Sequence, residues 1–133
     1  MTDVVATEQI RVLMPLCATL GIEVDAYQPD GVAMSLRWSE SLCTSNGIMH
    51  GGALMALADS AGGACAFLNL PEGAGGTATI ESKTNFLAAL RSGVATATSK
   101  PLHVGGRTIV VETEVRSSEG RLVAKVTQTQ AVL

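Results

Sequence analysis

One apolar stretch of the chain contains two sets of chemical groups that could take part in a reaction. The first is the run His50-Gly51-Gly52, which lies where a helix would begin. Free backbone N–H groups and the positive end of the helix dipole favour a developing oxyanion there, so a carbonyl oxygen could dock at this point. The second feature is Asp59, the only formally charged side chain in residues 41–71.

Asp59 requires an explanation, because the helix around it consists mainly of Ala, Leu, Met, Gly and Ser. Apart from Met55, the residues one helical turn away are small, namely Ala56, Gly62 and Gly63. Small side chains on this face open a slot through which another backbone or a thin ligand can come close. The structural alternative is that Asp59 accepts a hydrogen bond from a backbone amide or pairs with a distant arginine.

His50 alone indicates little, because a single histidine is more often a hydrogen-bonding structural residue than a catalyst or a ligand. It also cannot form a dyad with Asp59 inside one chain. Nine residues along a helix give about 13.5 Å of rise and roughly 180° of rotation, so the two side chains point away from each other. Any site that uses both ends of this helix needs two chains.

The stretch that contains both features, residues 48–70, is about as long as a membrane-spanning helix, for which ~20 residues suffice. Its glycines and its central Asp59 argue against a membrane, because a charge at the bilayer centre costs at least roughly 2.5 to 3.5 kcal/mol. We expect a helix buried inside a soluble protein, since it is apolar on every side.

The remainder of the chain predicts one short helix and about six strands. Residues 7–20 have apolar side chains at helical spacing, with Pro15 disturbing the helix. Alternating polarity between glycine-rich turns predicts strands at residues 22–27, 32–39, 77–87, 94–103, 107–116 and 121–132. A twisted antiparallel sheet wrapped around the long helix is the economical arrangement, in the α+β class. No linker divides the chain, so we expect residues 1–133 to form a single domain.

Composition excludes several classes of function. The 133 residues carry a formal net charge of −3, and the nine Lys and Arg form no basic run, so nucleic acid is not an expected partner. Hydrophobic residues make up 47% and charged residues 16%, which favours a homo-oligomer that buries part of the surface. Three cysteines without CxxC spacing indicate reduced thiols, and no signal peptide is apparent, so we expect a cytoplasmic protein.

The sequence NGIMHGGALMALADSAGG, residues 46–63, resembles the hallmark of hotdog-fold acyl-CoA thioesterases of the phenylacetyl-CoA and 4-hydroxybenzoyl-CoA type. In this motif an acidic residue follows the second glycine of His-Gly-Gly by seven positions. The residue pairs at 85–86 and 106–107 extend the likeness over residues 21–133. The resemblance implies the hotdog fold and hydrolysis of acyl-CoA.

The resemblance also implies roles for individual residues. By position, the acidic nucleophile or general base of the family falls on Asp59, and its oxyanion-binding amide falls on the N–H of Gly51. In the family these groups come from opposite subunits, which agrees with the helix geometry above and implies a dimer or a dimer of dimers. His50 corresponds to an organiser of the loop and of the thioester carbonyl.

Two further side chains follow from the same comparison. Many relatives have Asn or Gln six residues before the histidine, where this chain has Thr44, while an amide side chain occurs at Asn46. Either residue could polarise the carbonyl. In some relatives a hydroxyl on the strand after the helix positions the water, and the matching residue is Thr79, with Ser60 and Ser82 as less favoured alternatives.

Coenzyme A carries phosphates, and Arg91, Lys100 and Arg107 near turns are candidate contacts for them, although solvated turn charges are the alternative. The family implies a nucleotide at the protein surface with its pantetheine arm reaching inward through the interface. His50 and His103 form no metal-ligand pattern, and Cys65 has no partner base. We therefore expect no metal, no cofactor and no thiol chemistry.

Hydrolysis of acyl-CoA to a free acid and coenzyme A is the predicted function. One alternative is a module that binds acyl-CoA without cleaving it, although such sensors are expected to carry an output domain for which this length leaves no room. A hotdog hydratase is a third alternative, which the lack of a second acid or histidine beside Asp59 weakens. The acyl group stays open among aryl, short-chain and medium-chain types, since one methylene discriminates by only about 1 to 3 kcal/mol.

Overall fold

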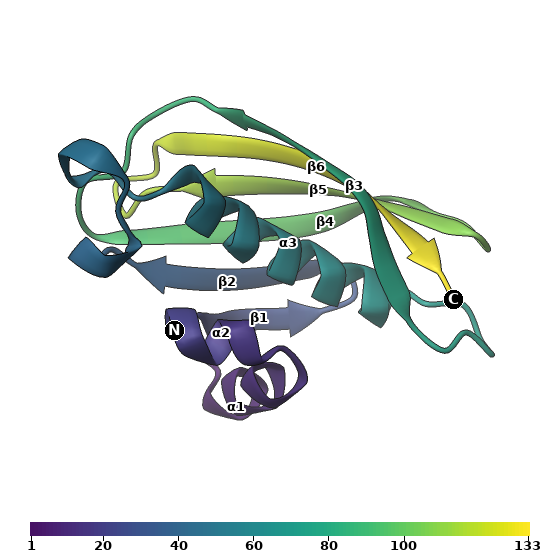
Figure 1. Ribbon diagram of the computed structural model, residues 1–133. Coiled ribbons are helices and arrows are strands. Elements are labelled where there is room, and N and C mark those ends of the chain that lie inside the picture. Colours follow the sequence, from purple (N-terminus) through teal and green to yellow (C-terminus); the bar gives the residue numbers. More distant parts are fainter.

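The computed structural model describes residues 1–133 and consists of one six-stranded antiparallel sheet, a long helix against it and two short N-terminal helices (Figure 1). The elements are α1 (Val4–Leu13), α2 (Pro15–Leu20), β1 (Glu23–Gln28), β2 (Gly31–Arg37), the 3-10 turns η1 (Glu40–Leu42) and η2 (Ser45–Gly47), α3 (Gly51–Leu68), β3 (Thr77–Phe86), β4 (Val94–Val104), β5 (Thr108–Arg116) and β6 (Leu122–Val132). The strand order is β1-β2-β4-β5-β6-β3. The predicted α+β arrangement of sheet around helix is confirmed.

The long helix α3 lies along one face of the sheet, here called the inner face, and packs against all six strands (Figure 1). Its buried side chains include Leu54, Leu57, Ala61 and Cys65. Full burial of each leucine contributes roughly 1.5 to 3 kcal/mol, so this packing is a large part of the stability. By length and composition the 18 residues of α3, with a mean hydropathy of 1.3, could cross a membrane, but the core helix of a soluble protein passes the same test.

All six strands begin and end within two residues of their predicted bounds. The N-terminal segment differs from the prediction, because residues 7–20 do not form one helix. Met14 has φ −124° and ψ 86°, outside the helical region, and it separates α1 from α2. Pro15 is the cause, since it lacks a backbone N–H and disfavours a helical residue before it, but its fixed φ suits the first position of a new helix.

Alternation along the central strands sorts side chains onto the two faces of the sheet. On β5 the buried residues are Ile109, Val111, Thr113 and Val115. The Thr113 hydroxyl shares a buried hydrogen bond of 2.6 Å with the hydroxyl of Ser99 on β4. Even the polar side chains of the inner face are therefore paired within the core at this point.

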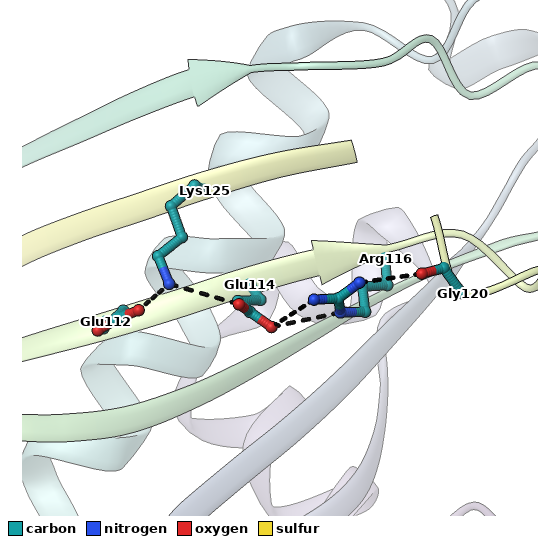
Figure 2. A network of polar contacts seen from close by, with 5 residues as sticks. All are labelled: Glu112, Glu114, Arg116, Gly120 and Lys125. Atoms are coloured by element: carbon teal, nitrogen blue, oxygen red, sulfur yellow. Dashed lines mark hydrogen bonds and ion pairs between the residues drawn. The ribbon is translucent and has the colours of Figure 1, made fainter. Parts of the chain in front are cut away.

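The outer face of the sheet carries a line of paired charges (Figure 2). Lys125 on β6 lies between Glu112 and Glu114 of β5 and forms an ion pair with each. Glu114 also pairs with Arg116 at 2.9 Å, and Arg116 donates to the carbonyl of Gly120 at 3.0 Å. These side chains are 32 to 46% exposed, so every charge in the line has both water and a partner.

Strand β3 forms one edge of the sheet and pairs only with β6. Most of its ten residues are exposed, including Ile80, whose side chain is 60% exposed. A register shift between Thr79 and Glu81 marks a bulge near its start. The free side of β3 therefore presents unpaired backbone N–H and C=O groups over a long stretch.

Candidate active site

Helix α3 begins with a cap made by a histidine. The Nδ1 atom of His50 accepts a hydrogen bond from the N–H of Gly52 at 2.7 Å, and its carbonyl accepts from the N–H of Ala53 at 2.9 Å. The N–H of Gly51 has no acceptor within the chain. It is therefore free to bind a carbonyl oxygen or an oxyanion at the positive end of the helix dipole.

Gly51 faces a hollow of about 460 Å³ with mainly apolar walls, here called the Gly51 hollow. Thr44 and Leu90 form part of its wall. The ring of Phe86 lies against Gly51, because a Cβ atom at position 51 would be 2.9 Å from Phe86 Cζ. Since Phe86 is the last residue of β3, this end of the edge strand borders the helix start.

Asn46, one of the two candidates for polarising the carbonyl, lies in the short loop before α3. It has a φ of +65°, a left-handed conformation that asparagine tolerates better than most residues. The neighbouring carbonyl of Gly47 accepts a hydrogen bond from Trp38 Nε1 at 3.1 Å, which ties the loop to the end of β2. Asn46 is exposed and does not line the Gly51 hollow, whereas Thr44 does.

Asp59 accepts two hydrogen bonds, and both end on the same carboxylate oxygen. Thr79 Oγ1 of β3 and Gln128 Nε2 of β6 each lie 2.8 Å from Asp59 Oδ1. Asp59 Oδ2 accepts no hydrogen bond from the chain, and Asp59 takes part in no ion pair. The structure thus has neither the backbone amide nor the arginine that the structural alternative requires. A carboxylate with one free oxygen can accept a proton from water or attack a carbonyl carbon.

Two buried glutamines complete the Asp59 cluster, which comprises Asp59, Thr79, Gln128 and Gln130. Gln128 is fully buried, Gln130 is 1% exposed, and Gln130 Nε2 donates to Thr79 Oγ1 at 2.7 Å. Sequence reasoning missed both glutamines, although they occupy inward positions of β6 that continue from the buried Val126. A buried amide needs a polar partner, so this break in the apolar alternation was an available signal.

The small-residue slot beside Asp59 is filled in part by Gln128. A Cβ atom at position 62 would overlap Gln128 Oε1, whereas one at Gly63 would meet no atom within 4 Å. Gln128 Oε1 is buried and has no hydrogen-bond partner. The expected opening therefore exists at Gly63, and the space at Gly62 holds the glutamine amide.

Asp59 also borders an open pocket of about 400 Å³, here called the Asp59 pocket. Its walls include Leu13 at the end of α1, Met14 in the break before α2, and Phe67 from α3. Tyr27 lies in the same wall, and burial raises the pKa of its phenol, which therefore stays neutral. An apolar group bound to a carbonyl would fit this lining.

The two chemical features are well separated within one chain. Gly51 and Asp59 lie eight residues apart on the same continuous helix, which corresponds to about 12 Å of rise. They also face different spaces, the Gly51 hollow and the Asp59 pocket. An oxyanion donor and a base must both lie within about 3 Å of the reacting group, so these two cannot serve one carbonyl from the same chain.

The three cationic candidates do not converge in the single chain. Arg91 follows Leu90, whose carbonyl accepts from the N–H of Met49 at 2.8 Å, so this loop lies beside the start of α3. Lys100 is exposed in the middle of β4, and Arg107 lies in the turn between β4 and β5. Only Arg91 is near the Gly51 end of the helix.

The remaining titratable side chains form no second site. No group of three or more His, Cys, Asp or Glu side chains could hold a metal ion, and all three cysteines are free. Burial, together with the charge of Asp30, raises the pKa of the Cys65 thiol to about 11. A thiol that is protonated at neutral pH is a poor nucleophile.

Comparison with known proteins gives consistent matches. A model of the thioesterase superfamily matches residues 46–124, which include the whole of α3. A 1,4-dihydroxy-2-naphthoyl-CoA hydrolase from Listeria monocytogenes is 30% identical over 112 residues, or 83% of this chain and 89% of that protein.

Solved structures match over most of the chain. The crystal structure of a thioesterase from Haemophilus influenzae has a TM-score of 0.88 and 27% identity, covering 96% of this chain and 90% of that one. A hypothetical thioesterase protein from Streptococcus pneumoniae, solved with coenzyme A, has a TM-score of 0.76 and 28% identity over 84% of this chain and 85% of that one. This likeness confirms the hotdog fold.

Proposed function

Because the chain belongs to the thioesterase superfamily and is thus a thioester hydrolase, we propose that its substrates are acyl-CoA thioesters, which it cleaves to a free acid and coenzyme A. The observation that carries this proposal is the Asp59 carboxylate, which has one free oxygen beside an apolar pocket. The name of the Listeria relative and the coenzyme A in the Streptococcus structure support a coenzyme A thioester as substrate.

The carbonyl oxygen of the thioester binds the free N–H of Gly51. As the carbonyl carbon becomes tetrahedral, this oxygen acquires negative charge, and the N–H and the helix dipole stabilise it. His50 supports this step indirectly, since its ring occupies the N–H of Gly52 and keeps the cap in shape. Thr44, in the wall of the Gly51 hollow, is better situated than Asn46 to reach the same oxygen.

Asp59 Oδ2 acts on the carbonyl carbon in one of two ways. As a general base it takes a proton from water, and the resulting hydroxide adds to the carbon. As a nucleophile it adds directly, which gives a mixed anhydride that water then hydrolyses. In both routes the C–S bond breaks and its electron pair leaves with sulfur as the coenzyme A thiolate. An ordinary thiol has a pKa of about 8.5, so this leaving group needs little help from an acid.

Thr79 helps to position the water on the general-base route. Its single O–H already donates to Asp59 Oδ1, and one lone pair accepts from Gln130. The second lone pair can accept a hydrogen bond from the attacking water. Thr79 would then hold the water beside the carboxylate, and the other proton of the water would remain available to Asp59.

Each site is formed by two copies of the chain. The distance between Gly51 and Asp59 supports a shared site. The edge strand β3 could join the two chains, because its Thr79 end contacts Asp59 and its Phe86 end contacts Gly51. Antiparallel pairing of two β3 edges about a twofold axis would bring the Phe86 end of one chain to the Thr79 end of the other. We propose a dimer, or a dimer of dimers, with two such sites per dimer.

The nucleotide of coenzyme A lies at the surface near the Gly51 end, where Arg91 is the first candidate for its phosphates. Lys100 and Arg107 are distant along the chain and would contribute only from another subunit. The free cysteines are consistent with the reducing cytoplasm as the compartment.

A panel of acyl-CoA thioesters tests the activity, with the released thiol as readout. We expect turnover of at least one aryl or aliphatic member. A protein that binds acyl-CoA but releases thiol from no member would instead be the non-catalytic binding module.

Complementation tests the shared site. Asp59→Asn and Gly51→Ala chains are each expected to be nearly inactive, but a mixed dimer has one site with both native groups. Random mixing should therefore restore about a quarter of the parental activity. Verified mixed dimers without recovery would show that the two groups do not act across the interface.

A further inference from the structure

We infer that Gln128 and Gln130 are positioning residues that orient Asp59 for the reaction, and that Gly62 makes the space in which Gln128 does so. The inference rests on the proposed function of Asp59. Neither glutamine donates a hydrogen bond to the free oxygen Oδ2, so both act through Asp59 Oδ1 and Thr79.

The two hydrogen bonds fix which carboxylate oxygen faces the substrate. The torsion that turns a carboxylate has broad, shallow minima, so an unsupported Asp59 would exchange its two oxygens freely. Gln128 and Thr79 approach Oδ1 from different strands, β6 and β3, and each bond is 2.8 Å long. Rotation of the carboxylate would break both bonds together, so Oδ2 is held as the free oxygen.

The donors are neutral, and this matters for the reaction. An arginine would engage both carboxylate oxygens in a bidentate pair and would leave neither free. An amide and a hydroxyl converge on a single oxygen and keep the negative charge of Asp59 without a counter-ion. The pattern favours a carboxylate held for chemistry over one held for stability.

Gln130 sets the direction of the second bond. A hydroxyl has one proton, and Thr79 could give it to several acceptors. Gln130 Nε2 donates to Thr79 Oγ1 at 2.7 Å, which occupies a lone pair and leaves the Thr79 proton for Asp59. Gln130 therefore acts on Asp59 indirectly, through the Thr79 hydroxyl.

The position of Gln128 is costly for the core, which argues that its bond to Asp59 is its role. Its Oε1 atom is buried without a partner against Gly62. A leucine or methionine would fill similar space without an unpaired oxygen. Only a glycine at position 62 leaves room for this amide, since any Cβ atom there would overlap it.

Steady-state kinetics of Gln128→Leu test the inference. We expect kcat to fall about 10- to 100-fold, because a displaced carboxylate loses its alignment, while KM for the acyl-CoA stays within about twofold. Gln130→Leu should give a smaller fall in kcat with the same unchanged KM. Thr113→Val is the matched control, since it removes another buried hydrogen bond of the same sheet, and its kcat should equal that of the parent.

A double-mutant cycle tests the part of Gly62. Gly62→Ala should lower kcat by pushing the Gln128 amide away from Asp59. In the Gln128→Ala background the added methyl has room, so Gly62→Ala should lower kcat no further. Additive losses would overturn the claim that Gly62 acts through Gln128.

Asp59→Asn, measured in parallel, separates this inference from the proposed function. If Asp59→Asn is inactive and folded Gln128→Leu keeps the parental kcat, the positioning role is wrong and the proposed function stands. If Asp59→Asn keeps the parental kcat, the proposed function fails first. Should Gln128→Leu not fold, the kcat of Gly62→Ala decides, and a parental value would overturn the positioning role.

Discussion

The two faces of this sheet treat charge in opposite ways. On the outer face, Lys125 lies between two glutamates and Arg116 extends the line, so each charge has an opposite partner (Figure 2). On the inner side, Asp59 of the helix α3 accepts from two neutral donors on one oxygen and takes part in no ion pair. The difference agrees with the roles proposed for these charges, stability and solubility on the outer face and catalysis for Asp59.

The largest effect is expected from Asp59→Asn, which removes the charge proposed to act in catalysis. Turnover should fall by about 10²- to 10⁴-fold, because an amide can be neither base nor nucleophile. Acyl-CoA affinity should stay near the parental value, and the melting temperature should equal or exceed it, since no counter-ion is left unpaired. Thiol release, ligand titration and thermal melting measure the three quantities. A lowered melting temperature with unchanged turnover would make Asp59 a structural residue.

Gly51→Ala should have the next largest effect. The added methyl would meet the Phe86 ring and crowd the approach to the backbone N–H. Loss of one oxyanion donor costs about 10²- to 10³-fold in kcat. A folded Gly51→Ala protein with parental kcat would exclude this amide as the oxyanion donor.

Lys125→Met should have a small effect on stability and none on turnover. Lys125 is 32% exposed and pairs with two glutamates, and exposed pairs contribute about 0 to 1 kcal/mol. We expect the free energy of unfolding, measured with urea, to decrease by about 0 to 1 kcal/mol in this variant. The decrease should be smaller at high salt, which screens the ion pairs. A large loss of kcat in this variant would contradict the division between the two faces.

The last prediction concerns the reactivity of the Cys65 thiol, which lies on the helix α3. Its raised pKa of about 11 means that the neutral thiol dominates at pH 7 and that reactive thiolate increases only as the pH rises toward that value. Iodoacetamide should therefore modify Cys65 much more slowly than the partly exposed Cys43 at neutral pH. Mass spectrometry of the digested protein measures both rates, and equal rates would contradict the raised pKa.

The fold could be predicted closely because its signals are local. Glycine-rich turns and alternating polarity determine strand bounds, and a long apolar run with a single charge indicates a buried helix. The N-terminal segment is the exception, because α1 begins at Val4 rather than at residue 7 and ends before a break at Met14. At that break the restriction that Pro15 imposes on its predecessor decides the geometry.

The site could be predicted only in part, because hydrogen-bond partners depend on strands far apart in the chain. Asp59 and Gly51 stand out in the sequence by charge and by motif. Gln128 lies 69 residues from Asp59, and its amide reaches the carboxylate only because α3 packs against β6. The register between β3 and β6 likewise places Gln130 opposite Thr79. The sequence also does not show which of Arg91 and Arg107 lies near Gly51, because the two arginines lie at opposite ends of β4.

The edge strand β3 has one more consequence for the proposed dimer. Thr79 and Phe86 are seven residues apart on this strand, so they are separated by about 24 Å. If two β3 strands pair, their register alone sets the gap between the oxyanion donor of one chain and the carboxylate of the other. A slip of two residues would change that gap by about 7 Å, which is more than the length of a hydrogen bond. The register of the two β3 strands would then determine the distance between the two reactive groups. Residues that fix this register would therefore be as necessary for activity as Gly51 and Asp59.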